Sequence, residues 1–169
     1  MVETAPDDVR YCIRCGGAMA TRAVHGTARR GCPSCGHVHF TDPKVGVGVL
    51  CVHEGRVLLV RRGMDPERGR WALPAGFLDA GEDPRTRAAQ EVLEETGLTV
   101  AVGDVVDVFG GHPGGATVFV LYAGAYVAGT PVAGDDADEA RFFGPDELPD
   151  LAFESTLAGV RRWLDSRAE

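Results

Sequence analysis

Residues 76–98 read GFLDAGEDPRTRAAQEVLEETGL, and this stretch predicts the element around which the rest of the chain is organised. Its second half carries Glu91, Glu94 and Glu95, which fall within one sector of about 100° if the segment is helical. The opposite side would carry Ala89, Val92, Leu93 and Thr96. We therefore expect a helix that turns one side to a core and presents three carboxylates to whatever lies across from it.

The residues at the two ends of this segment support the helix. Asp83 is a candidate N-cap, Pro84 suits the first helical position, and Gly97 suits the C-cap. Like charges one turn apart destabilise a bare helix by only about 0.2–0.5 kcal/mol, so a solvated acidic face is the alternative. A loop over residues 73–82 leads directly into the helix. Carboxylates beside such a loop favour a site for Mg²⁺, which prefers oxygen ligands and leaves positions for substrate phosphates.

The spacing of fixed residues in this stretch resembles the Nudix box of diphosphate-cleaving hydrolases. That box is Gly, five residues, Glu, seven residues, Arg-Glu, an apolar residue, any residue, Glu-Glu, any residue, Gly and an apolar residue. The corresponding residues here are Gly76, Glu82, Gln90, Glu91, Val92, Glu94, Glu95, Gly97 and Leu98. Eight of the nine agree, and the exception is Gln90, where the family has arginine. The resemblance implies an α/β fold, namely an α/β/α sandwich with a mixed sheet.

The same resemblance implies a catalytic metal site. It assigns Glu91, Glu94 and Glu95 as catalytic ligands for Mg²⁺ or Mn²⁺, with a backbone carbonyl of Ala75 or Gly76 as a further ligand. Such ions neutralise phosphate oxygens and activate water at neutral pH, which is what phosphoanhydride hydrolysis requires.

Family members often add a catalytic carboxylate from outside the box. The candidates are Asp136, Asp138 and Glu139, in an acidic segment that is otherwise readily explained as a solvated loop. We favour Glu139 as ligand or general base because it comes just before an Arg-Phe-Phe strand similar to the one that follows this position in the family.

Three further residues are candidates for binding substrate. Arg61 and Arg62 end a predicted strand just before the box loop, where either could reach a phosphate, although arginines are also common at exposed strand ends. His112 lies in a glycine-rich loop over residues 110–115, which we expect at the mouth of the substrate pocket.

Gln90 is the departure that bears on activity. The family's arginine orients nearby carboxylates by charge-assisted hydrogen bonds, whereas glutamine donates only a weaker neutral bond. Gln90 lies about 40° from Glu94 around the helix and could still orient it. Arg87, four residues before Glu91, shares the carboxylate face and is the candidate to restore the missing charge. We expect activity that is retained but reduced.

Four of the five cysteines form two Cys-x2-Cys pairs, Cys12 with Cys15 and Cys32 with Cys35. In a chain that opens on polar, acidic residues unlike a secretory signal, such pairs predict a tetrahedral structural zinc site rather than disulfides. The segment resembles a zinc ribbon, and about 30 residues are too few to fold on an apolar core alone. Cys51 stands in an apolar run and is expected in the core.

Asp42-Pro43 marks the expected domain boundary, with a tail and zinc ribbon over residues 1–41 and a Nudix hydrolase domain over residues 42–169. The ribbon is expected to serve as a scaffold or an interface, so a homodimer is one open possibility. Binding of nucleic acid is the alternative, for which the argument would be the ribbon arginines Arg14, Arg22, Arg29 and Arg30.

The net charge of −8 argues against broad binding to nucleic acid, which needs basic surface. No apolar run approaches the roughly 20 residues that span a bilayer. We therefore expect a cytoplasmic enzyme whose partner is a small nucleotide substrate, with no membrane association.

Hydrophobic alternation and turn residues place the remaining elements of the second domain. The expected elements are a hairpin of residues 44–52 and 56–60, strands at 71–74, 99–109 and 117–127, a helical turn at 145–148, and a closing helix at 155–167. The closing helix is expected to turn inward Leu157, Val160, Trp163 and Leu164.

A four-cysteine ribbon before a Nudix domain occurs in NADH pyrophosphatases and in a smaller group that includes FAD and ADP-ribose pyrophosphatases. The former carry a Ser-Gln-Pro-Trp-type motif after the box, and residues 99–120 contain none. The segments 42–44, 71–76 and 151–155 are similar to the smaller group. The resemblance therefore implies cleavage of the pyrophosphate of ADP-ribose, FAD or a similar compound. The alternatives are a ligand-sensing regulator with weakened catalysis, which Gln90 motivates, and an NADH pyrophosphatase or RNA-decapping activity.

Overall fold

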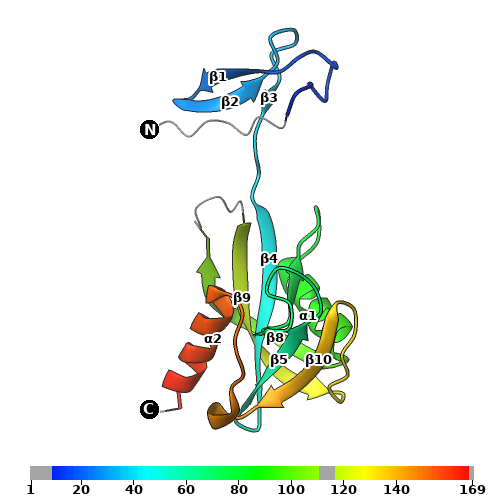
Figure 1. Ribbon diagram of the computed structural model, residues 1–169, viewed down its shortest axis with the longest axis vertical. Coiled ribbons are helices and arrows are strands. Elements are labelled where there is room, and N and C mark those ends of the chain that lie inside the picture. The colour runs from blue at the N-terminus through cyan, green and yellow to red at the C-terminus, as the bar shows by residue number, and fades with distance from the viewer. Residues whose placement is uncertain (1–8, 111–116, 168–169) are drawn as a thin grey trace. The chain divides into compact units, whose positions relative to one another are not determined.

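A computed structural model describes residues 9–110 and 117–167 of the chain. The chain divides into two compact units, Met1–Asp42 and Pro43–Glu169, and each is described by itself (Figure 1).

The first unit contains a small antiparallel sheet in the order β1-β2-β3. Its strands are β1 (Ala20–Val24), β2 (Thr27–Gly31) and β3 (Val38–His39). His25 and Gly26 connect β1 to β2 with φ values of 51° and 79°, as a tight two-residue hairpin turn requires. The buried apolar cluster of this unit comprises Cys12, Met19 and Cys32, with Val9 packed against it. So small a core cannot stabilise the unit by burial alone.

The second unit is built on a mixed sheet in the order β10-β5-β4-β9-β8, with β6 paired to β5 and β7 to β4. Its strands are β4 (Lys44–His53), β5 (Arg56–Arg62), β6 (Trp71–Ala72), β7 (Ala75–Phe77), β8 (Thr99–Phe109), β9 (Thr117–Ala128) and β10 (Ala137–Phe143). β4 and β9 run parallel, whereas the other pairs are antiparallel. Glu54 and Gly55 form the predicted turn between β4 and β5, both with positive φ.

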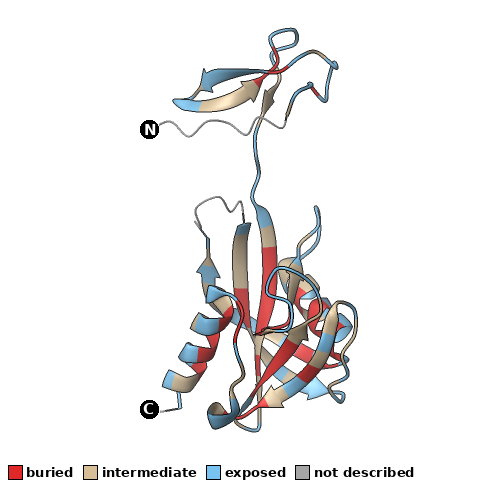
Figure 2. Cartoon of the chain, viewed as in Figure 1, coloured by how far each residue is buried: buried red, intermediate tan, exposed pale blue. Residues whose placement is uncertain are grey.

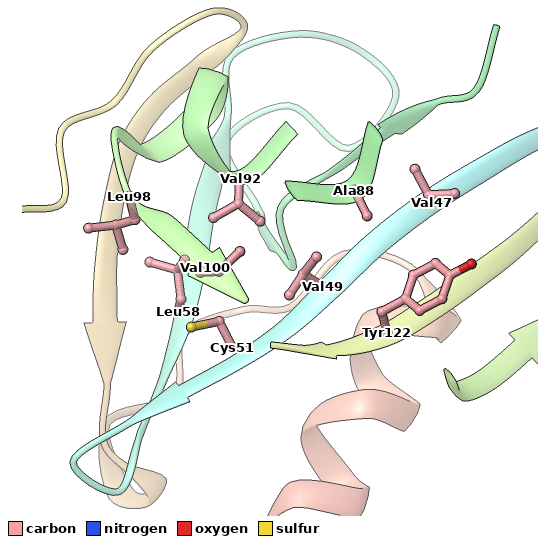
Figure 3. Packing of buried hydrophobic residues seen from close by; sticks show 9 residues of the cluster. All are labelled: Val47, Val49, Cys51, Leu58, Ala88, Val92, Leu98, Val100 and Tyr122. Carbon is pink, nitrogen blue, oxygen red and sulfur yellow. The ribbon is translucent and has the colours of Figure 1, made fainter. Parts of the chain in front are cut away.

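Helices cover both faces of this sheet: α1 (Pro84–Thr96) lies on one and α2 (Glu154–Asp165) on the other, with a short 3-10 helix, η1 (Pro145–Glu147), before α2. Strand alternation explains the two layers. Leu58 of β5 packs with Val92 of α1 (Figure 3), whereas the next residue, Leu59, packs with Val160 and Trp163 of α2. Buried residues accordingly gather along β4 and β5 and on one side of α2 (Figure 2). The predicted α/β/α sandwich with a mixed sheet is confirmed.

The ends of α1 are fixed by local signals. The Asp83 carboxylate accepts hydrogen bonds from the Thr86 amide at 2.9 Å and the Thr86 hydroxyl at 2.8 Å, and Pro84 occupies the first turn. Gly97 adopts a left-handed conformation with φ of 68°, and its amide donates to the Leu93 carbonyl. The predicted caps are therefore present at both ends.

The side of α1 that faces the core differs from the prediction in two respects. Leu93 is 51% exposed, whereas Glu91 and Glu95 are buried with the helix residues Ala88 and Val92. The helix packs on β4, β7 and β8 through this stripe, so the carboxylates of Glu91 and Glu95 lie inside the interface between helix and sheet rather than opposite it.

The inward side of α2 was also predicted incorrectly at one position. Val160 and Trp163 are buried as expected, but Leu157 is 47% exposed. Thr156 and Gly159 are buried in its place, and a Cβ at Gly159 would lie 2.8 Å from Leu121 Cδ2 and 3.0 Å from Leu73 Cδ1, so the glycine favours close packing of the helix on the sheet.

Candidate functional site

The two Cys-x2-Cys pairs of the first unit converge on one point. The sulfurs of Cys12, Cys15, Cys32 and Cys35 all lie within 4.8 Å of one another, with Sγ to Sγ distances of 3.6 Å for Cys12 and Cys35 and 3.5 Å for Cys15 and Cys32. Zinc bound to four thiolates at about 2.3 Å places the sulfurs about 3.8 Å apart. The donor set and its spacing thus fit a tetrahedral zinc site and are consistent with a zinc ribbon.

Each cysteine pair is carried by the same kind of turn. The Gly16 amide donates to the Cys12 carbonyl at 2.8 Å, and the Gly36 amide donates to the Cys32 carbonyl at 2.9 Å. Both glycines have positive φ, at 72° and 76°, which residues with a Cβ rarely adopt. The repeated turn explains why a glycine follows the second cysteine of each pair.

Hydrogen bonding gives two of these thiols, Cys32 and Cys15, very different pKa values. The Cys35 backbone amide donates toward the Cys32 sulfur and lowers the pKa of that thiol to about 6. The Gly17 amide also favours the Cys15 thiolate, but hydrogen bonds with the Cys35 and Cys32 thiols raise the pKa of Cys15 to about 12. Neighbouring thiols cannot all ionise side by side, and a bound cation is what would make four thiolates compatible.

In the second unit, the box loop lies directly against helix α1. β7 pairs with β4, which fixes the backbone of Ala75 and Gly76. The Ala75 amide donates to Glu95 Oε2 at 3.0 Å. A Cβ at Gly76 would overlap the carboxylate of Glu91, so that carboxylate lies against the bare Cα of the glycine. The loop backbone and the two buried carboxylates therefore form one contiguous site.

Burial changes the pKa of two of the box carboxyl groups, those of Glu91 and Glu95. Glu91 and Glu95 are 4% and 6% exposed. Burial raises the pKa of Glu91, against the opposing effect of Arg87. Burial also raises the pKa of Glu95 to about 8, although its hydrogen bond from Ala75 favours the ionised form. Two buried carboxyl groups one helical turn apart are stabilised as carboxylates by a cation, and oxygen donors suit Mg²⁺ or Mn²⁺.

Glu94, the third box glutamate, lies at the edge of this site. Its side chain is 46% exposed and its Oε2 accepts a hydrogen bond from Arg87 Nη1 at 3.2 Å. It is therefore held beside the buried pair while remaining accessible to solvent.

The segment before β10 brings two more carboxylates to the same place. The Gly134 amide donates to the Glu95 carbonyl at 3.1 Å, which docks this segment on the C-terminal turn of α1. The charge of Asp135 raises the pKa of Glu91, and that of Asp136 raises the pKa of Glu95. Asp135 was not singled out from the sequence, because the acidic run gives no indication of which members turn toward the helix.

Glu139 and Arg61 lie on the other face of the sheet. Glu139 is inside strand β10 rather than before it, and it pairs in register with Arg61 of β5. Alternation places both on the side of Leu59, which packs against α2. Arg61 Nη2 is 3.8 Å from Glu139 Oε2, and Arg141 Nε is 3.7 Å from Glu139 Oε1. Glu139 is thus paired with arginines away from the box glutamates.

Arg62, by contrast, is four residues after Leu58 in β5. Because side chains alternate along a strand, Arg62 lies on the same face of the sheet as Leu58, which is the face that α1 covers. Its charge acts on Glu95, lowering the pKa of that carboxyl against the effect of burial. The Arg62 guanidinium also lies 4.8 Å from the centroid of the Phe153 ring. Arg62 is therefore placed beside the carboxylate cluster, whereas the predicted binding residue His112 lies outside the described residues.

Comparisons with known proteins agree with this geometry. The sequence profile of the NUDIX domain matches residues 42–164. An ADP-ribose pyrophosphatase from Methanocaldococcus jannaschii is 33% identical over 129 residues, which cover 73% of this chain and 76% of that protein. A crystal structure of a NUDIX hydrolase from Nitrosomonas europaea superposes with a TM-score of 0.86 at 33% identity, covering 94% of this chain and 92% of that one.

A more distant group of relatives differs in size. An NAD-capped RNA hydrolase from Vibrio atlanticus is 27% identical over 153 residues, which cover 89% of this chain but only 55% of that protein. The chain thus spans about half the length of that relative.

The chain belongs to the Nudix family, because the family profile covers most of its length and two relatives are each 33% identical to it over 73% or more of the chain. The predicted enzyme class, a Nudix pyrophosphohydrolase, is confirmed. Of the helices in the described residues, none is both long and apolar enough to span a membrane.

Proposed function

We propose that this enzyme hydrolyses the pyrophosphate of ADP-ribose or a closely similar nucleoside diphosphate derivative, using Mg²⁺ or Mn²⁺. The observation that carries the proposal is the cluster of Glu91, Glu94 and Glu95 against the backbone of Ala75 and Gly76. Similarity to an ADP-ribose pyrophosphatase over about three quarters of both chains supports this substrate class.

In this proposal the three glutamates are the metal ligands, and a carbonyl of Ala75 or Gly76 adds another. Bound Mg²⁺ or Mn²⁺ would neutralise the phosphate oxygens and lower the pKa of a coordinated water. The Ala75 amide orients the Glu95 carboxylate by holding one of its oxygens. The bare Cα of Gly76 leaves room for the carboxylate of Glu91.

Arg62 is the proposed contact to a substrate phosphate, because alternation along β5 places it on the face of the sheet that α1 covers and its charge acts on Glu95. Asp136 is the proposed carboxylate outside the box that accepts a proton from the attacking water, because it belongs to the segment that docks on the C-terminal turn of α1 and its charge acts on Glu95. Glu139, favoured from the sequence, is paired with Arg61 and Arg141 instead. Four thiolates would hold a structural zinc ion in the first unit.

The reaction breaks one phosphoanhydride bond. The water oxygen bonds to one phosphorus, the bridging oxygen leaves with the other, and the water proton passes to a carboxylate and then to solvent. With ADP-ribose the products are AMP and ribose 5-phosphate. Each product therefore ends in a phosphate monoester, which is what an assay should detect.

A substrate panel tests the proposal directly. The purified full chain is incubated with ADP-ribose, FAD, NADH, diadenosine polyphosphates and nucleotide sugars, each with Mg²⁺, with Mn²⁺ and with a chelator. We expect metal-dependent release of AMP from ADP-ribose with the highest kcat/KM. E95Q keeps the shape of the side chain but removes its charge and should lower kcat by at least a hundredfold.

The same panel separates the remaining candidates. The relatives named as NAD-capped RNA hydrolases favour NAD-capped RNA as a second substrate class. With NAD-capped RNA added to the panel, a higher kcat/KM for it or for NADH would replace ADP-ribose as the proposed substrate. Binding of a panel compound without metal-dependent hydrolysis of any would instead support a ligand-sensing regulator.

A further inference from the structure

The guanidinium of Arg87 lies between the box loop and the box helix and contacts both. Its Nη2 forms an ion pair with Glu91 Oε1, and its Nη1 donates to Glu94 Oε2 at 3.2 Å. Its Nε donates to the Phe77 carbonyl at 3.4 Å and lies 4.0 Å from Glu82 Oε2. The Arg87 side chain is 23% exposed, so these contacts are partly shielded from solvent.

Gln90, at the position where the Nudix box has arginine, has a different environment. Its side chain is exposed, and no hydrogen bond connects it to Glu94 within the part of the chain that the structure describes. No contact in the described residues therefore supports the expectation that Gln90 orients Glu94. Arg87 has the contacts with Glu94 and Glu91 that a carboxylate-orienting arginine needs.

We propose that Arg87 is the positioning residue of this metal site and takes the place of the arginine that the box lacks at position 90. It holds Glu91 and Glu94 in one orientation and ties both to the loop through Phe77 and Glu82. The proposal rests on the proposed function for its catalytic consequence, but its effect on metal binding does not depend on the substrate.

Arginine chemistry suits this role. A guanidinium carries five N–H donors in one rigid plane, whereas a carboxylate has two oxygens and can accept several hydrogen bonds. Arg87 engages one oxygen of Glu91 and one of Glu94, which leaves the second oxygen of each carboxylate for a cation. Its charge also offsets the repulsion among the clustered carboxylates, which would otherwise move apart.

The test moves the positive charge from position 87 to position 90. Mn²⁺ binding to the full chain is measured by electron paramagnetic resonance without substrate, and hydrolysis of ADP-ribose and thermal unfolding are measured in parallel. We expect R87Q to bind Mn²⁺ at least fivefold more weakly and to lose at least tenfold in kcat/KM. The double variant R87Q/Q90R should return both quantities to within threefold of the wild type.

R85Q is the matched control, because it makes the same substitution on the same helix. Arg85 donates to the Gly103 carbonyl and lies 5.2 Å from the centroid of the Tyr122 ring, away from the box glutamates. R85Q should stay within twofold of the wild type in Mn²⁺ binding. If R87Q does not fold, R87K and R87K/Q90R decide the question, since lysine keeps the charge but cannot hold two carboxylates in one plane. R87K should bind Mn²⁺ at least threefold more weakly, and R87K/Q90R should recover.

Wild-type Mn²⁺ affinity in R87Q, or no recovery in either double variant, would overturn the positioning role. A loss in R87Q that R85Q shares would also overturn it, because the effect would then be general to the helix. If the wild type hydrolyses no panel compound while the Mn²⁺ results follow the expected pattern, the proposed function fails and the positioning role stands.

Discussion

The carboxylate of Glu91 lies against the Cα of Gly76, so that the helix and the loop of the box approach each other without room for a side chain. Gly76 does not have positive φ, and its requirement for glycine is therefore one of space rather than of backbone conformation. G76A should displace Glu91 and lower kcat/KM about a hundredfold, because small misplacements of catalytic groups have effects of that order. Steady-state kinetics at saturating Mg²⁺ measures the effect.

G103A provides the control for this prediction. A Cβ at Gly103 would lie 3.5 Å from the Ala123 carbonyl oxygen, an ordinary contact. The variant should keep kcat/KM within about twofold of the wild type. Equal activity of G76A and G103A would show that the close approach of Gly76 and Glu91 has no part in the site.

The four-cysteine cluster predicts that zinc stabilises the first unit. C35S removes one of the four sulfurs, and removing a ligand from a site on which folding depends should unfold residues 9–41 while the second unit remains folded. Zinc content by atomic emission should fall from one ion per chain to less than 0.1, as an order-of-magnitude expectation. Amide signals of the first unit in ¹H–¹⁵N NMR spectra should collapse to random-coil positions.

C51A is the matched control, because Cys51 is fully buried in the core of the second unit, on the α1 face of the sheet (Figure 3). Burial raises the pKa of Cys51 to about 11, as befits a thiol in an apolar environment. C51A should keep one zinc ion per chain and a folded first unit. Full zinc content in C35S would contradict the four-cysteine site.

The sequence was sufficient to predict structural features that depend only on residues close together in the chain. The caps at Asp83 and Gly97 follow from local backbone chemistry, and so does the turn at Glu54-Gly55. The spacing of the box glutamates is likewise a local property of one helix. These features could be predicted because no distant part of the chain is needed to form them.

Features that depend on distant contacts could not be predicted in the same way. Leu93 and Leu157 are apolar yet exposed, because the buried stripe of each helix is chosen by the shape of the sheet beneath it. Glu139 was expected just before a strand, but β10 begins at Ala137, and the pairing of Glu139 with Arg61 of β5 sets which face the Glu139 side chain occupies. A shift of one residue in the pairing register moves every side chain of a strand to the other face of the sheet.

Asp136 precedes β10 whereas Glu139 lies within it, and an isosteric variant of each tests which carboxylate takes part in catalysis. Asp136 acts electrostatically on the buried Glu95, whereas Glu139 is paired with Arg61 on the opposite face. D136N should therefore lower kcat at least tenfold, and E139Q should lower it less than threefold, if the proposed hydrolysis is correct. Kinetics with ADP-ribose at constant Mg²⁺ would measure both. The reverse order would restore Glu139 as the catalytic carboxylate.

The N-cap of α1 predicts a pH dependence of stability. The Thr86 amide and hydroxyl donate to the Asp83 carboxylate and lower its pKa below the ordinary value. A carboxyl group whose pKa is lower in the folded state stabilises the protein above its unfolded-state pKa, and this contribution disappears as the pH falls through the folded-state pKa. D83N keeps a side-chain oxygen that accepts the Thr86 hydrogen bonds but cannot titrate. At pH 7, D83A should lower the Tm by about 2–4 °C and D83N by less. Between pH 5 and pH 3, thermal unfolding should show the wild type losing its advantage over D83N, and a constant difference in Tm across this range would mean that the Asp83 charge does not stabilise the helix that carries the box glutamates.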